Sequence, residues 1–169
     1  MDPIENLAIG VGSQLVTPRI AIKTLDCEFT RWMGEPLTDP YGKTVLCWKG
    51  QPLFAELIIV AELKAAGWNA YWADTFSQRF RSGWQPNLAR GEQGGVSIQE
   101  FRSLLPAARH PIAFEQWRGI WDVIAWGNGS VRFYELKGER DQLRETQKEW
   151  LETVLQSGAE LDEFRLINW

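Results

Sequence analysis

Hydrophobic and polar positions follow a clear strand-turn-strand pattern between residues 121 and 137. The run Trp121–Trp126 reads Trp-Asp-Val-Ile-Ala-Trp and is rich in the apolar and β-branched residues typical of a strand. Gly127-Asn128-Gly129 follows it, and both residue types tolerate the positive φ angles of tight hairpin turns. A returning strand is expected over Val131–Lys137. The pattern therefore predicts a β-hairpin.

The returning strand has two faces of different character. Because side chains alternate on a strand, one face is expected to carry Val131, Phe133, Glu135 and Lys137, and the other Arg132, Tyr134 and Leu136. The first face begins with apolar residues, so it is expected to point into the core. An acid and a base at the end of such a face are costly to bury unless a cation or another partner compensates them.

A helix is expected after the glycine that ends this strand. Asp141 is its predicted N-cap and Gly158 its end. The apolar stripe of this helix consists of Leu143, Trp150, Leu151, Val154 and Leu155. Gln147 lies on the same stripe, four residues after Leu143 and three before Trp150. A glutamine that faces inwards needs a polar partner, and the end of the Glu135 strand is the nearest candidate.

An earlier apolar segment, Leu53–Ala66, predicts a helix that stops at Gly67-Trp68. Its residues leave almost no polar face, which indicates a helix buried on most sides. Glu56 interrupts the apolar surface and has no Lys or Arg three or four residues away, so its carboxylate requires a cation from elsewhere. Glu62 is the competing acid, but it lies near the helix end close to Lys64, where an exposed position suits it.

These residues suggest metal-dependent cleavage of phosphodiesters, which needs a cation held by carboxylates and a nearby ammonium. The steps Gly119-x-x-Asp122, Glu135-x-Lys137 and Gln147-x-x-Trp150 resemble the PD-(D/E)XK nuclease superfamily, most of all its VRR-NUC and Holliday-junction-resolvase-like branches. The resemblance covers residues 52–74 and 119–169. Trp121 stands where the family usually has proline.

The resemblance implies an α/β protein with a restriction-endonuclease-like core. This αβββαβ core has a mixed central sheet flanked by helices, and Glu163–Trp169 supplies its last strand. Residues 1–169 would then form a single nuclease-like domain, which suits a 169-residue chain with 44% hydrophobic residues. Residues 1–50 would be a β-rich N-terminal extension, and residues 75–118 an insertion between the first and second core strands.

The resemblance also implies catalytic roles. Mg²⁺ or Mn²⁺ would be bound by Asp122, Glu135 and the Leu136 carbonyl, which agrees with the one or two protein carboxylates that Mg²⁺ usually takes. Glu56, whose spacing to Gly67 is similar to that of the family's first-helix acid, would orient a metal-bound water. Lys137 would position or help deprotonate the attacking water. Gln147 would hold that water or a phosphate oxygen.

Taken one at a time, the same residues have ordinary structural interpretations. Glu135 and Lys137 could form an exposed ion pair that contributes little, and Gln147 and Trp150 could be a capping amide and a core aromatic. The alternative function is a catalytically inactive nucleic-acid-binding or assembly module with a nuclease fold. An enzyme of the same fold that acts on RNA in place of DNA is the other alternative.

The net charge of −4 does not mark a nucleic-acid binder, but positive charge gathers in residues 75–118. This segment holds three acids and six arginines, which are Arg79, Arg81, Arg90, Arg102, Arg109 and Arg118, a local balance of +3. We expect contacts to nucleic acid, most of all DNA, from Arg79, Arg81, Arg118 and Arg140. A mixed helix-loop segment that only packs over the sheet is the alternative.

The first fifty residues predict a small antiparallel meander. The β-rich runs are Arg19–Leu25, Cys27–Trp32 and Thr44–Trp48, with a turn at Asp39-Pro40-Tyr41-Gly42. Gly42-Lys43-Thr44 is similar to part of a phosphate-binding loop, but it lacks the required first glycine and is better explained as part of a hairpin.

Several function classes are excluded by composition. Cys27, Cys47 and a single histidine, His110, give no persuasive zinc site and no serine or cysteine triad. The cysteines are expected to be reduced thiols of a cytoplasmic protein. No apolar run reaches the length of a membrane span, so no membrane partner is expected. The sequence leaves open whether the protein is a monomer or a homodimer.

Overall fold

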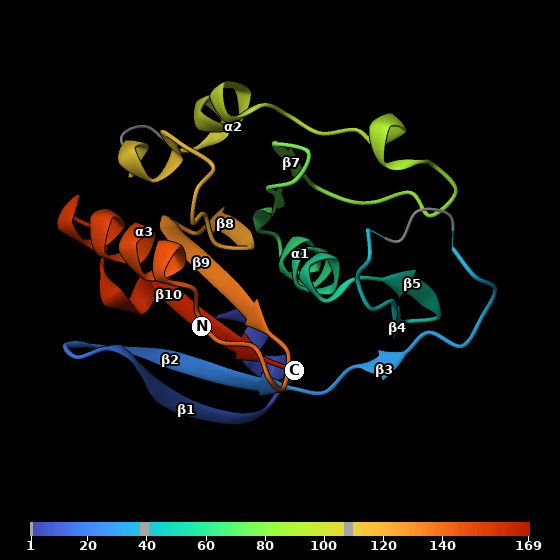
Figure 1. The fold of residues 1–169 in the computed structure, drawn as a ribbon, viewed down its shortest axis with the longest axis horizontal. Coiled ribbons are helices and arrows are strands. Elements are labelled where there is room, and N and C mark those ends of the chain that lie inside the picture. Colours follow the sequence, from blue (N-terminus) through green and yellow to red (C-terminus); the bar gives the residue numbers. More distant parts are fainter. Residues whose placement is uncertain (1, 38–40, 107–109) are drawn as a thin grey trace.

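One mixed β-sheet organises the chain in a computed structural model that describes residues 2–37, 41–106 and 110–169. Its strands are β1 (Ala8–Thr17), β2 (Ile20–Cys27), β6 (Asn69–Asp74), β7 (Arg79–Arg81), β8 (Val123–Gly127), β9 (Ser130–Lys137) and β10 (Phe164–Asn168). The order of these seven strands is β1-β2-β10-β9-β8-β6-β7 (Figure 1). Strand β10 runs parallel to both β2 and β9, and the other neighbours are antiparallel.

Helices cover both faces of this sheet. Helix α1 (Ala55–Ala65) packs in a core with Val123, Ala125, Tyr134 and Leu136, which we call the α1-side core. Helix α3 (Glu145–Gln156) packs in a second core with Ile124, Phe133 and Phe164, the α3-side core. The short helix α2 (Ile98–Leu104) adds Phe101 to the α3-side core. The predicted α/β class with a mixed sheet between helices is therefore confirmed.

The predicted hairpin is confirmed as the pair β8 and β9. Gly127 pairs with Ser130, and the two loop residues, Asn128 and Gly129, have φ angles of 51° and 76°. Two positive φ angles in a two-residue loop match the twist of the adjoining strands, which explains the Asn-Gly sequence. The predicted alternation on β9 is also confirmed, because Val131 and Phe133 lie in the α3-side core, whereas Tyr134 and Leu136 lie in the α1-side core.

Two predicted helix starts were wrong by a few residues. Helix α3 begins at Glu145, and Asp141 is not its N-cap. Asp141 closes a short turn instead, since its backbone N–H donates to the Gly138 carbonyl at 2.9 Å. Helix α1 begins at Ala55 because the preceding residues belong to strand β5 (Gln51–Leu53). Its predicted stop at Gly67 is confirmed by a φ of 84°.

The predicted N-terminal meander was wrong. Strand β1 was missed, and the β1-β2 hairpin extends the main sheet through the parallel pair β2-β10. Strands β3 (Thr30–Arg31), β4 (Leu46–Trp48) and β5 form a separate small sheet. Alternation along a sequence shows that a segment suits a strand, but it does not identify the strand's partner. Asp39, Pro40 and Arg109, to which a turn and a positive charge were assigned, lie outside the described residues.

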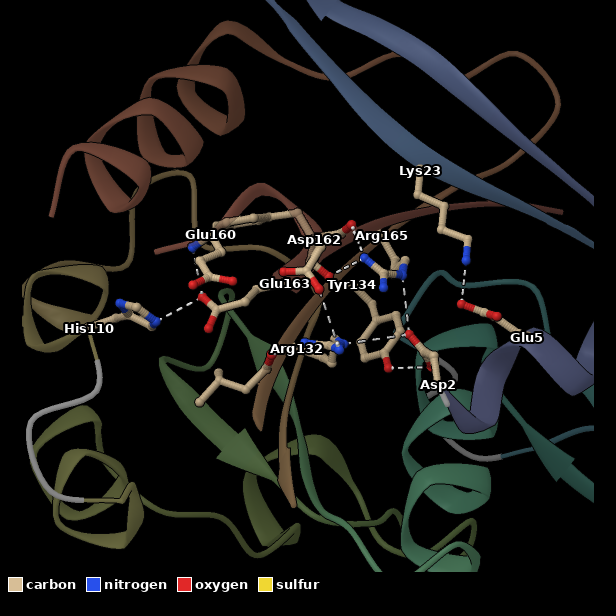
Figure 2. A network of polar contacts seen from close by, with 12 residues as sticks. Asp2, Glu5, Lys23, His110, Arg132, Tyr134, Glu160, Asp162, Glu163 and Arg165 are labelled. Atoms are coloured by element: carbon tan, nitrogen blue, oxygen red, sulfur yellow. Dashed lines mark hydrogen bonds and ion pairs between the residues drawn. The ribbon is translucent and has the colours of Figure 1, made fainter. Parts of the chain in front are cut away.

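A buried polar network fixes the N-terminal segment against β9 and β10 (Figure 2). The Tyr134 hydroxyl donates to Asp2 Oδ1 at 2.9 Å, and Arg165 Nε lies 3.3 Å from Asp2 Oδ2. Arg132 Nε lies 4.0 Å from the same Asp2 oxygen. Burial, and then the Asp2 charge, raise the pKa of Tyr134 well above its ordinary value. The network thus links the first residues to the strand that also carries Glu135.

The approach to β8 depends on one glycine. Gly119 has a φ of 79°, and a Cβ atom there would lie 2.1 Å from the backbone oxygen of Thr146 in α3. Two residues later, Trp121 is fully buried and its Nε1 donates to the Gln147 carbonyl at 3.3 Å. The segment before β8 is therefore packed directly against the first turn of α3.

We expect Gly119→Ala to destabilise the protein more than Gly67→Ala does. Gly67 has a similar φ of 84°, but a Cβ atom there would meet no atom within 4 Å. Gly67→Ala therefore reports the backbone penalty alone, about 1–2 kcal/mol. Gly119→Ala adds a clash with backbone, expected to cost a further ~1–3 kcal/mol. Urea denaturation of the two variants measures the difference in the free energy of unfolding. Equal losses of stability would show that α3 shifts away from residue 119 at no energetic cost.

Candidate functional site

The residues singled out from the sequence meet in one cleft at the end of the central strands. The cleft has a volume of about 260 Å³. Its walls include Lys43, Thr44, Ala55, Glu56, Asp122, Glu135, Leu136, Lys137, Gly138, Asp141, Arg144 and Trp169. These residues comprise four carboxylates and three cationic side chains, so the wall carries a surplus of negative charge.

The topology explains why these side chains meet. Strands β8 and β9 are antiparallel, so Asp122, directly before β8, lies beside Glu135 near the end of β9. The Asp122 backbone is held on its other side because Ala73 N–H of β6 donates to its carbonyl at 2.8 Å. Glu56 and Gln147 come from the first turns of α1 and α3 on opposite faces of the sheet.

Asp122 and Glu135 hold each other in place through the backbone. The Leu136 N–H donates to Asp122 Oδ2 at 2.9 Å, and the Asp122 N–H donates to Glu135 Oε2 at 3.3 Å. This reciprocal arrangement fixes both carboxylates with little freedom to rotate. It also leaves Asp122 partly exposed at the cleft wall, whereas Glu135 is buried.

Glu135, Lys137 and Gln147 form a buried triangle. Lys137 Nζ lies 2.7 Å from Glu135 Oε1 and 3.1 Å from Gln147 Oε1. Gln147 Nε2 donates to Glu135 Oε1 at 2.5 Å, and the Arg144 N–H donates to Gln147 Oε1 at 3.0 Å. The inward position and the partner predicted for Gln147 are thus confirmed. In addition, Gln147 caps the start of α3.

Glu56 is buried and forms an ion pair with Lys43. The cation that the sequence required for Glu56 therefore comes from the loop before β4. Sequence reasoning missed Lys43 because this loop lies 13 residues upstream of Glu56 and is joined to it only by the fold. The one available signal was the Gly42-Lys43-Thr44 run, which was interpreted as part of a hairpin. Arg144, which also lines the cleft, was missed as well.

The electrostatics of the cleft favour an added positive charge. Although Asp122 is partly exposed at the cleft wall, enclosure of its carboxylate by the surrounding protein raises its pKa well above its usual value, and the nearby negative charges of Glu135 and Glu56 raise it further. Burial also raises the pKa of Glu135, although Lys137 and Gln147 oppose this shift. Burial alone would lower the pKa of Lys43, but its attraction to Glu56, Asp122 and Asp74 outweighs burial and raises it.

A hard divalent cation fits this donor set in part. Within residues 2–37, 41–106 and 110–169, no three His, Cys, Asp or Glu side chains form a group that could hold a metal ion. The oxygen donors on hand are two adjacent carboxylates, Asp122 and Glu135, and Leu136 lies in the same wall. Mg²⁺ commonly uses only about one or two protein carboxylates and keeps several waters, so two carboxylates suffice for it.

The arginines expected to contact nucleic acid differ in exposure. Arg81 is buried, its Nε lies 2.9 Å from Asp74 Oδ2, and its Nη1 donates to the Gln93 carbonyl at 2.8 Å. The prediction for Arg81 is therefore wrong, because a guanidinium enclosed by these partners cannot reach a phosphate. Arg79, Arg118 and Arg140 are exposed. Arg118 lies beside Glu149, in a separate depression on α3.

Comparison of the chain with protein-family models, with curated proteins and with solved structures finds no match. Across the part of the chain that the structure describes, no helix combines the length and the apolar character needed to cross a membrane.

The Arg81 correction predicts different effects for two neighbouring arginines. Arg81→Ala leaves the buried Asp74 carboxylate without its cation, so we expect the free energy of unfolding to fall by about 3–5 kcal/mol. Arg79→Ala removes an exposed side chain two residues away and is expected to change it by less than about 0.5 kcal/mol. Chemical denaturation of both variants measures this contrast. Similar losses of stability in the two variants would contradict the prediction.

Because the pKa of Asp122 is raised, we expect Asp122→Asn to stabilise the fold by an amount that depends on pH. A group whose pKa is higher in the folded state stabilises the fold at low pH and loses that contribution as pH rises through the folded-state pKa. In metal-free buffer the variant should therefore have a higher Tm than the wild type at pH 8. Each kcal/mol of added stability raises the Tm of a domain of this size by about 2–4 °C. The advantage should vanish towards pH 4.

Asp141→Asn, which changes an exposed carboxylate on the same cleft wall, is the matched control. Thermal unfolding in EDTA at both pH values measures the effect. A gain that is the same at both pH values would show that the charge of Asp122 is not its cause.

Proposed function

We propose that the protein is a divalent-metal-dependent nuclease of the PD-(D/E)XK type, with a restriction-endonuclease-like core, that hydrolyses phosphodiester bonds in DNA. The observation that carries the proposal is the convergence of Asp122, Glu135 and Lys137 in one cleft. Gln147 forms hydrogen bonds with two of these residues, Lys137 and Glu135. Their order along the chain and their positions directly before β8, on β9 and on α3 agree with the resemblance found in the sequence.

The chain's own groups have distinct tasks in this proposal. Mg²⁺ or Mn²⁺, held by Asp122, Glu135 and the Leu136 carbonyl, would supply positive charge to the phosphate. Lys137, buried between Glu135 and Gln147, would hold a water molecule in line with the phosphorus atom. A bond would form between the water oxygen and phosphorus as this water gives up a proton to the solvent in the cleft. The ester P–O bond would break, and the departing oxygen would take up a proton from the same solvent. Glu56 would orient the water from the α1 side.

The surroundings of the carboxylates suit a phosphate. Lys43 and Arg144 add positive charge to the lining of the cleft. Helix α1 begins beside the cleft, and its N-cap, Phe54, offers no side-chain acceptor to the first N–H groups. Uncapped N–H groups and the helix dipole both attract anions. A phosphodiester could therefore bind between the two helix starts while a cation neutralises the carboxylates.

One observation favours the alternative, a catalytically inactive nucleic-acid-binding module. Glu56 and Glu135 each have a lysine partner, Lys43 and Lys137, that already neutralises part of their charge. In an inactive protein these ion pairs would be permanent. In an enzyme they would rearrange when the cation binds, so metal binding and cleavage distinguish the two functions.

Cleavage assays test the proposal directly. Branched, duplex and single-stranded DNA and RNA are incubated with the protein and Mg²⁺ or Mn²⁺, and products are separated on denaturing gels. We expect cleavage that EDTA abolishes and that Asp122→Ala or Lys137→Ala reduces by about 100-fold or more, the scale of losing a group that stabilises the transition state. Unchanged cleavage in either variant would refute the assignment.

The choice of Glu56 over Glu62 has its own control. Glu62 lies on the same helix but pairs with Lys49 and does not line the cleft. Glu56→Gln should therefore slow cleavage, whereas Glu62→Gln should leave it unchanged. Circular dichroism of both variants checks that the fold is retained.

A further inference from the structure

An exposed aromatic ring stands on the turn between β6 and β7. Phe76 is 78% exposed, although most large apolar side chains of the chain are buried. Its neighbours Thr75, Gln78 and Arg79 are polar and exposed as well. A protein-docking surface usually presents a contiguous apolar patch. Phe76 is instead a single ring among polar and cationic groups.

Arg90 supports this ring from one side. The Arg90 guanidinium lies 4.1 Å from the centre of the Phe76 ring and 4.2 Å from the centre of the Tyr41 ring. It is thus in contact with two aromatic rings, each at a distance that allows a cation–π interaction. Because Phe76 remains largely exposed, a flat group has access to the ring despite the contact with Arg90.

A continuous set of contacts connects this ring to the cleft. Tyr41 packs edge-on against Trp72 of β6, with ring centres 5.7 Å apart. Lys43 Nζ lies 5.5 Å from the centre of the same Trp72 ring and forms the ion pair with Glu56 at the cleft wall. These contacts pass through Trp72, which is buried, so they link the ring to the α1 side of the cleft by packing. The Ala73 N–H at the end of β6 donates to the Asp122 carbonyl, so the turn that carries Phe76 follows β6 at the same end of the sheet as the cleft.

We propose that Phe76 and Arg90 form a stacking platform for an unpaired base of the nucleic acid whose phosphate enters the cleft. The inference rests on the proposed nuclease function and adds a substrate class to it: strands with unpaired nucleotides beside the cleavage site. An exposed ring stacks on any base, since every base has a π-face. Bases inside a duplex are already stacked and cannot use such a platform.

Binding measurements test the platform without requiring cleavage. Fluorescence anisotropy, with Ca²⁺ in place of Mg²⁺, compares a plain duplex with the same duplex that carries a short single-stranded gap. Phe76→Ala should weaken binding of the gapped DNA by about 10-fold, which is the scale of one lost stacking contact. The affinity for the plain duplex should not change. Phe76→Trp should restore binding.

Two controls separate stacking from loss of exposed apolar surface. Met33→Ala removes an apolar side chain that is 89% exposed and is not among the residues that line the cleft, so it should have no effect. A gapped DNA whose unpaired nucleotides lack bases should bind the wild type as weakly as the intact gapped DNA binds Phe76→Ala. With this base-free DNA, Phe76→Ala should bind as tightly as the wild type does.

The outcomes distinguish the two proposals. If the wild type cleaves and binds DNA but Phe76→Ala binds gapped DNA as tightly, the stacking platform is overturned and the nuclease function stands. An equal loss for duplex and gapped DNA also overturns it. If the wild type neither binds nor cleaves any nucleic acid, the proposed function fails and the platform fails with it.

Discussion

Burial of charge along β9 is the constraint on which the rest of the structure depends. On one side, Tyr134 and Arg132 meet Asp2 and Arg165 in a network closed by the protein itself (Figure 2). At the end of the strand, Glu135 and its neighbours open into a cleft whose carboxylates outnumber its cations. A buried charge is tolerated only when it is compensated. The closed network therefore has a structural role, whereas the surplus of carboxylates in the cleft favours binding of a cation.

The features predicted correctly from the sequence all depend on short-range regularities. The hairpin followed from Asn128-Gly129, and the inward position of Gln147 followed from helical periodicity. Once β8 and β9 are antiparallel neighbours, Asp122 and Glu135 must lie side by side, because the start of one strand meets the end of the other. Local pattern and adjacency were sufficient to bring the main carboxylates together.

The features that could not be predicted depend on contacts between distant segments. Lys43 reaches Glu56 from a loop before the small sheet, and β2 pairs with β10 across most of the chain. Nothing in the local pattern identifies either partner. Arg81 illustrates a different failure. Its charge counted towards a basic segment, but the β6-β7 hairpin places it beside Asp74, which cancels that charge within the core.

The loss of Arg81 from the exposed charges changes how this chain could hold nucleic acid. With a net charge of −4 and a cleft lining in which carboxylates outnumber cations, attraction to phosphates summed over many contacts is weak. If the protein is the nuclease proposed above, recognition would then rely on short-range contacts that a specific strand makes at defined points. The cation between Asp122 and Glu135 would bind one phosphate, and a stacked base at Phe76 would fix the strand beside it. An acidic protein can in this way select an unpaired strand without the long-range attraction that basic proteins have for any duplex.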